Sequence, residues 1–149
     1  LADRARQVTH GLPPGVLKHA GLHAAIASHC EAVAGQQSFL VRFESRGNFH
    51  DVPTDVALCL YRATQQALRN VPMHANALRV WVSLARIGNR IELNISDNGC
   101  GFDTSNAGMR GLGLLSIEER VHLAQGKFTI TSRLGGGSRM TISIPVGWA

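Results

Sequence analysis

A polar stripe along one predicted helix carries the first residues that could do chemistry. Arg62, Gln66 and Asn70 recur at four-residue spacing, so they stack along one face of a helix that runs from about residue 55 past Asn70, to about residue 74. The side-chain carbonyl of Asn70 is a hard oxygen ligand, suited to a Mg²⁺ ion that is otherwise held by phosphates and water. The alternative interpretation is a solvated polar face without a ligand.

Two glycine-rich segments are candidates for ligand binding. The first, residues 97–102 (DNGCGF), directly follows a predicted strand. Its glycines allow the backbone to approach a flat ligand closely, and the Asp97 carboxylate can accept a hydrogen bond from an exocyclic amine. The second, residues 108–114 (GMRGLGL), opens a predicted helix, where free N–H groups and the helix dipole favour an anion. The first segment alone also fits an ordinary turn, and a single GxG before a helix is weak evidence for a ligand.

The elements that must position these residues follow from hydrophobic periodicity and turn signals. Helices are predicted over about residues 15–34, 55–74 and 114–124, and strands over 38–44, 78–85, 90–96, 127–132 and 138–145. Tight turns at Gly88-Asn89 and at residues 135–137 make the strands on either side of them antiparallel. We therefore predict an α+β fold, a two-layer sandwich with the helices on one face of the sheet.

The composition is that of one globular domain. The chain has 149 residues, 44% hydrophobic and 17% charged, which excludes wholesale disorder, and no apolar run approaches the ~18 residues of a membrane span. The first ten residues do not read as a signal peptide but as an internal cut in a longer protein. The net charge of +5 comes from scattered arginines with only 5% aromatic residues, so nucleic acid is not an expected partner. A small phosphorylated ligand fits this charge equally well.

Taken together, the segments resemble the ATP-binding domain of sensor histidine kinases, in the superfamily that includes gyrase, the Hsp90 chaperones and MutL. The resemblance rests on residues 60–75 (LYRATQQALRNVPMHA), on DNGCGF at 97–102, on 111–121 (GLGLLSIEERV) and on GGGS at 135–138. It implies a Bergerat-type ATP-binding fold with a mixed, mostly antiparallel sheet. It also implies that residues 1–34 are the end of a dimerisation helix with a connecting helical segment, and that residues 35–149 are the ATP-binding catalytic domain.

The resemblance assigns four residues to the adenine end of a nucleotide site. Asp97 would accept a hydrogen bond from the adenine amino group, while Gly99 and Gly101 would shape the floor of that pocket. Ser138 stands where the family has Thr or Ser, and it would lie near the adenine through a water molecule.

The phosphate end is assigned in the same way. Asn70 would ligate Mg²⁺ between the phosphates, and Gly111 and Gly113 would present backbone N–H groups to them. His74 matches the His at the end of the family's helix motif and would approach the phosphates. Residues 102–110 would form a short mobile lid. The implied cofactors are ATP and Mg²⁺.

Three residues depart from the family pattern. Gln66 replaces a Glu, so the one position that could supply a base here cannot take a proton. Met73 replaces a Lys that would offset phosphate charge, and Pro72 removes an N–H near the end of the motif's helix. These departures bear on the efficiency of catalysis more than on the fold.

The resemblance implies the ATP-binding portion of a protein histidine kinase, not competent alone. It would serve phosphoryl transfer to a histidine on dimerisation helices, expected upstream of Leu1, and then to a response regulator. The parent protein would be a homodimer, this fragment a monomer, and the domain cytoplasmic, with or without a membrane anchor elsewhere in the parent. The alternatives are a degenerate nucleotide-sensing or docking module without kinase activity, and an ATPase-type switch of the same superfamily, which Gln66 disfavours.

Overall fold

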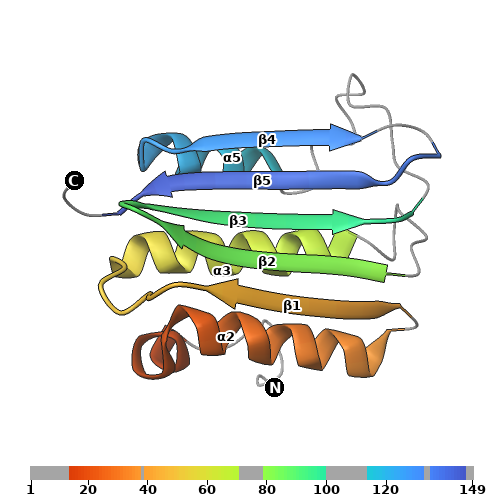
Figure 1. Cartoon of the computed structure of the whole chain (residues 1–149), viewed down its shortest axis with the longest axis horizontal. Helices are drawn as coiled ribbons and strands as arrows, with labels where there is room; N and C mark the ends of the chain where they lie inside the picture. Colours follow the sequence, from red (N-terminus) through yellow and green to blue (C-terminus); the bar gives the residue numbers. More distant parts are fainter. Residues whose placement is uncertain (1–13, 38, 71–78, 100–113, 133–134, 147–149) are drawn as a thin grey trace, which may run out of the picture.

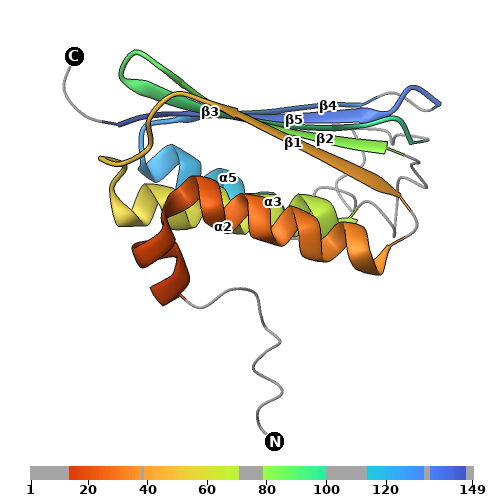
Figure 2. The ribbon, with the colours of Figure 1, turned by 60° about the horizontal axis from the view of Figure 1, so that its bottom comes forward.

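In the part of the chain that the structure describes, five strands form one sheet and three helices cover one of its faces (Figures 1 and 2). The computed structural model describes residues 14–37, 39–70, 79–99, 114–132 and 135–146. The elements, in chain order, are α2 (Pro14–Gln36), β1 (Leu40–Arg46), α3 (Thr54–Asn70), β2 (Arg79–Ile87), β3 (Arg90–Asp97), α5 (Leu114–Leu123), β4 (Lys127–Ser132) and β5 (Ser138–Pro145). The predicted two-layer α+β fold is confirmed.

The sheet is mixed and mostly antiparallel, as predicted. Its strand order is β1-β2-β3-β5-β4, and only the β1–β2 pair is parallel. This pair is parallel because α3 carries the chain back across one face of the sheet between the two strands. The turn between β2 and β3 uses Gly88 at φ +61°, a conformation that glycine adopts without steric cost.

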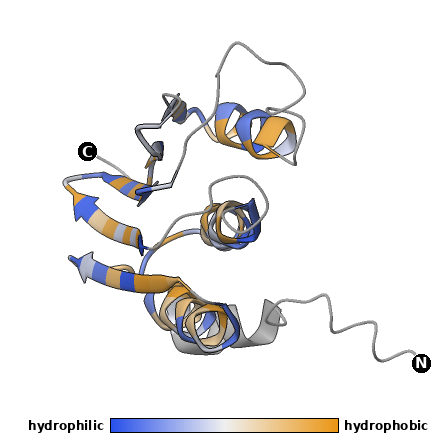
Figure 3. Ribbon diagram, turned by 90° about the vertical axis from the view of Figure 1, so that its right-hand side faces the viewer, coloured by the Kyte–Doolittle hydropathy of each residue, from blue (hydrophilic) through white to orange (hydrophobic). Residues whose placement is uncertain are grey.

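The core lies between the sheet and the helices. Hydrophilic and hydrophobic residues alternate along the strands (Figure 3), so each strand turns one face toward the helices. The buried residues on that face include Val80, Val82, Leu93 and Ile142. Two cysteines, Cys30 on α2 and Cys59 on α3, are buried in the same core, and burial raises the pKa of the Cys30 thiol to about 12. Burial also raises the pKa of the Cys59 thiol, so this residue packs as a small apolar side chain between Leu58 and Leu60 in the sequence.

Helix α2 differs from its predicted form. We predict one helix over residues 15–34, but α2 reaches Gln36 and contains a break at Gly21, whose φ of 88° and ψ of 168° are not helical. The apolar residues keep a helical spacing on both sides of this glycine, so the sequence pattern does not show the break. Beyond the break, Leu22, Ala25 and Ile26 are buried in the common core. The predicted domain division after residue 34 stays a prediction, and the first 13 residues of the predicted dimerisation and connecting segment lie outside the described residues.

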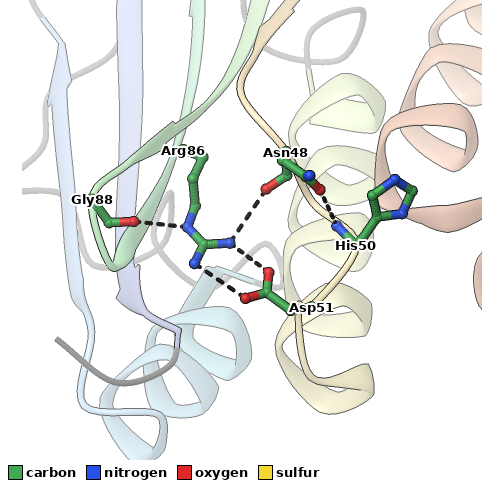
Figure 4. A network of polar contacts seen from close by, with 5 residues as sticks. All are labelled: Asn48, His50, Asp51, Arg86 and Gly88. Atoms are coloured by element: carbon green, nitrogen blue, oxygen red, sulfur yellow. Dashed lines mark hydrogen bonds and ion pairs between the residues drawn. The ribbon is translucent and has the colours of Figure 1, made fainter.

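A network around Arg86 ties the segment before α3 to the β2–β3 hairpin (Figure 4). The Arg86 guanidinium donates to Asp51 Oδ1 at 2.7 Å, to the Gly88 carbonyl at 2.8 Å and to the Asn48 carbonyl at 3.3 Å. Its hydrogen bond lowers the pKa of the Asp51 carboxyl. Gly47 makes this approach possible, because a Cβ there would lie 2.6 Å from Arg86 Cβ. The start of α3 is therefore held in place against the sheet.

Candidate functional site

The polar face of α3 brings together two of the predicted site residues. The opposite side of the helix is anchored in the core by residues that include Val56, Leu60 and Ala63. Gln66 and Asn70 are half-buried, and Gln66 Nε2 donates a hydrogen bond to Asn70 Oδ1 over 3.3 Å. The predicted stacking of these two amides on one helix face is thus confirmed. Because an amide side chain has no titratable proton acceptor, this pair can bind a cation or orient water but cannot act as a base.

The second group of site residues lies where β3 ends and β5 begins. Asp97 is the last residue of β3, and the register places it directly opposite Ser138, the first residue of β5. Asp97 Oδ1 accepts a hydrogen bond from the Gly99 N–H at 2.8 Å, and Oδ2 accepts one from Ser138 Oγ at 2.5 Å. Both carboxylate oxygens are therefore fixed by the protein. Each retains acceptor capacity for a donor such as an exocyclic amine.

The hydrogen-bond partner of Ser138 is not indicated by the sequence. The family resemblance implies a serine near the adenine through water, whereas the structure shows its hydroxyl bonded directly to the Asp97 carboxylate. The two residues are 41 positions apart in the chain, so no local pattern reveals the contact. The observed hydrogen bond gives Ser138 a role in orienting the carboxylate.

Gly137 is a site residue that sequence reasoning missed. It is buried at φ +78°, and a Cβ at this position would collide with the backbone carbonyl oxygen of Asp97. Its own carbonyl accepts a hydrogen bond from Ser132 Oγ at 3.1 Å, which fixes the start of β5 against the end of β4. The Gly135–Gly136–Gly137 run indicates a turn, but only the packing distinguishes the third glycine from the first.

We expect Gly137→Ala to disturb the site and Gly135→Ala to leave it intact. Both glycines have a φ near +79°, so both substitutions carry the left-handed backbone cost of about 1–2 kcal/mol. At Gly135 a Cβ meets nothing within 4 Å, whereas at Gly137 it meets Asp97. Gly137→Ala should therefore lose about 1–3 kcal/mol more stability in urea unfolding and should also weaken ADP binding. If the two variants lose the same free energy of unfolding, the contact with Asp97 does not contribute to stability.

The structure places the two groups of residues at the same end of the molecule. The C-terminal end of α3, with Asn70, and the C-terminal end of β3, with Asp97, both lie on the right in Figure 1. A ligand that spans this end could therefore meet Asp97 and Ser138 with one part and Asn70 with another. Four further predicted site residues lie outside the described residues: His74, Gly101, Gly111 and Gly113.

One described histidine, His50, is followed directly by an acidic residue, Asp51. A phosphoacceptor histidine is followed by an acidic residue on a helix, and His50-Asp51 has that local pattern. The structure places the pair in the connection between β1 and α3, where Asp51 binds Arg86. His50 is therefore not on an acceptor helix. Among the described residues, no group of three or more His, Cys, Asp or Glu side chains gathers to hold a metal ion.

Comparison with known proteins decides the family. Residues 55–147 match the family described as histidine kinase-, DNA gyrase B-, and HSP90-like ATPases, which is more than half of the chain. The chain belongs to this family. The match begins at the second residue of α3 and includes every predicted nucleotide-site residue.

Two curated relatives of this domain are sensor histidine kinases. The chain is 33% identical over 143 residues to the sensor histidine kinase MctS of Rhizobium johnstonii, covering 94% of this chain and 31% of that protein. It is 29% identical to the oxygen sensor histidine kinase NreB of Staphylococcus carnosus, covering 98% of this chain and 42% of that protein. The chain thus spans about a third to two-fifths of the length of these relatives. It corresponds to their ATP-binding part, as its motifs predict, and the alternatives of a docking module or an ATPase switch are not favoured.

Solved structures confirm the fold of this histidine kinase-type domain. The histidine kinase domain of the blue-light activated kinase EL346 from Erythrobacter litoralis superposes with a TM-score of 0.68 at 20% identity, over 84% of this chain and 61% of that one. The histidine kinase AdeS of Acinetobacter baumannii gives a TM-score of 0.61 at 17% identity, over 85% and 64% of the two chains. None of the helices in the described ranges has the length and hydropathy that a membrane span requires.

Proposed function

We propose that this domain binds Mg-ATP and positions its γ-phosphoryl group for transfer to a histidine on the dimerisation helices of the parent protein. The observation that carries the proposal is the Asp97 carboxylate, oriented by the Gly99 N–H and the Ser138 hydroxyl at the end of the molecule where α3 presents Asn70. A fixed carboxylate next to a glycine suits the amino group of adenine. An amide carbonyl on the neighbouring helix suits a cation held between phosphates.

We assign the roles of the individual residues from the family resemblance together with this arrangement. Asp97 would accept the adenine amino hydrogen, with Gly99 and Gly101 beneath the ring. Asn70 would hold Mg²⁺ through Oδ1, and the metal would neutralise the phosphate charge that builds up during transfer. The backbone N–H groups of Gly111 and Gly113 would bind the phosphates at the start of α5.

Phosphoryl transfer needs little covalent chemistry from the domain itself. A nitrogen of the acceptor imidazole forms the new P–N bond as the bond between the γ-phosphorus and the leaving ADP oxygen breaks. The protein contributes position and electrostatic stabilisation, and we assign His74 a place near the phosphates within that role. The phosphate would then pass to an aspartate of a response regulator.

The proposed setting is a cytoplasmic two-component system. The dimerisation helices of the same protein would be one partner and the response regulator the other, with a homodimeric parent and a monomeric isolated domain. The relatives named above are sensor kinases, and each is more than twice as long as this chain, which leaves room for such helices. Nucleic acid is not a proposed partner.

Nucleotide titration by calorimetry tests the binding part of this proposal. We expect the chain to bind both ADP and ATP, with Mg²⁺ strengthening the binding of ATP. Failure to bind either nucleotide at millimolar concentration would contradict the proposal and favour a docking module.

Labelling with γ-³²P-ATP tests the transfer part. The chain alone should acquire no acid-labile, base-stable phosphate, whereas addition of the upstream helices of the parent protein should produce it. A phosphohistidine at His10 in the isolated chain would contradict this assignment and place an acceptor inside the chain.

A further inference from the structure

The face of the sheet opposite the helices, called here the open face, is strongly cationic. It consists of the strand side chains that alternate with the buried ones, as the strand registers define. On the described strands it carries two carboxylates, Glu44 and Glu92, against six cations: Arg42, Arg46, Arg79, Arg90, Lys127 and Arg139. Six cations against two carboxylates leave an excess of four positive charges, most of the chain's net +5. Charges that are scattered in the sequence thus converge on one surface.

An exposed tryptophan lies at one end of this surface, near two of its arginines. The register aligns Trp81 with Arg42 on one side, and with Ser96 and then Arg139 on the other. Trp81 is 39% exposed, and nearby Leu40 at the end of β1 is 64% exposed. Two open hollows meet at Trp81, one of 410 Å³ that Leu40 and Arg42 also line, and one of 710 Å³ that Arg139 also lines. The open face therefore offers an apolar anchor point with Arg42 on one side and Arg139 on the other.

The surroundings of Trp81 distinguish between possible anionic partners. Single-stranded nucleic acids bind on several stacked aromatic side chains, and Trp81 is the one aromatic residue of the open face in the described strands. A membrane needs a continuous apolar surface, but Ser, Thr and Asn side chains occupy the centre of this face, including Asn94 and Thr141. A second copy of the chain would bring like charges together.

We propose that the open face docks an acidic protein surface that places an apolar side chain beside Trp81. Tryptophan and arginine are the residues that most often dominate binding energy at protein interfaces. Arg42 Nε lies 3.4 Å from Glu44 Oε2 and both side chains are largely exposed, so a partner carboxylate can replace Glu44 as the ion-pair partner of Arg42 at little cost. Five strands of about seven residues give a face of about 24 Å by 23 Å. The area of this face, roughly 550 Å², is smaller than the about 800 Å² that each partner contributes to a stable complex. A face of this size suits a transient contact.

Fluorescence anisotropy with labelled probes tests the chemistry of this surface. The first probe is an acidic peptide with a leucine at every fourth position, and the second is the same peptide with serine in place of leucine. A single-stranded DNA oligomer of equal charge and vesicles of phosphatidylglycerol complete the set. We expect the leucine peptide to bind most tightly. Failure of the leucine peptide to bind at low salt, or tighter binding of the DNA or the vesicles, would overturn the proposal.

Matched variants then localise the binding. Trp81→Ser and Arg42→Glu should each weaken binding of the leucine peptide by about 10-fold or more. Arg120→Glu makes the same charge change on the exposed surface of α5, in the helix layer, and should change binding less than about 2-fold. If Arg42→Glu and Arg120→Glu weaken binding of the leucine peptide equally, the net charge of the chain alone explains the binding, and the proposal is overturned. An unchanged thermal unfolding midpoint in each variant shows that the fold is retained.

Discussion

Asp97→Asn is expected to lower the affinity for ADP by about 10–150-fold, the equivalent of about 1.5–3 kcal/mol for a lost charge-assisted hydrogen bond. The structure gives the reason in atomic terms. The Gly99 N–H can only donate, so an amide at position 97 would keep its oxygen toward Gly99 and place its NH₂ group at the Oδ2 position beside Ser138. That NH₂ group is a donor, and it would face another donor, the adenine amine.

The fold should survive this substitution, because Asp97 lies at a strand end and the Ser138 hydroxyl can reverse to accept from the new amide. Ser138→Ala serves as the control, since it removes the group that orients the carboxylate but keeps the charge. We expect it to weaken ADP binding by only about 5-fold, the value of one ordinary hydrogen bond. Calorimetry measures both affinities, with thermal unfolding to verify the fold. An ADP affinity that stays within about 2-fold in Asp97→Asn would show that adenine does not bind at Asp97.

Gln66→Glu is expected to raise the rate of ATP hydrolysis, within the ~10²–10⁴-fold range that a general base contributes. The wild-type domain should therefore hold ATP and hydrolyse it very slowly. Gln66 and Asn70 share one face of α3, so if Asn70 holds Mg²⁺ between the phosphates, position 66 is close to the γ-phosphate. A carboxylate there can take a proton from the attacking water, which the amide cannot.

The observed contact adds a second effect of this substitution. Gln66 now donates to Asn70 Oδ1, whereas a glutamate can only accept and would bond to Asn70 Nδ2. The Asn70 carbonyl would then turn away from position 66 and become free for a metal ion. Gln66→Met, which makes neither interaction, is the control and should leave hydrolysis slow. In Gln66→Glu the affinity for ADP should change little, while the added negative charge lowers the affinity for ATP somewhat. Equal ATP turnover and equal ATP affinity in wild type and Gln66→Glu would show that Gln66 has a structural role only.

The elements of this domain, and the family to which it belongs, were predictable from local sequence. Alternation in β2 and β3 and the turn at Gly88-Asn89 predict that hairpin to within a residue or two, because a tight turn and its two strands are neighbours in the chain. The spacing of Gln66 and Asn70 predicts their contact for the same reason, since one turn of helix separates them.

Tertiary structure decided the features that join distant parts of the chain. The insertion of β5 between β3 and β4 brings Ser138 onto Asp97, and it leaves no room for a Cβ at Gly137, whereas Gly135 has open space. Neither fact follows from periodicity, because strand order is set by which apolar faces pack together over the whole core. The break at Gly21 is hidden for a related reason: the residues on either side keep a helical pattern while one glycine adopts non-helical angles.

The arginines show most clearly which features the local sequence determines and which the tertiary structure determines. Along the sequence they are scattered and indicate only a basic protein. Strand alternation assigns each strand residue to one face or the other, and the registers then bring Arg42 and Arg139 into one row with Trp81. A residue's face within its strand is a local property that the sequence determines, whereas its neighbours across the sheet depend on strand order and register, which only the assembled core determines.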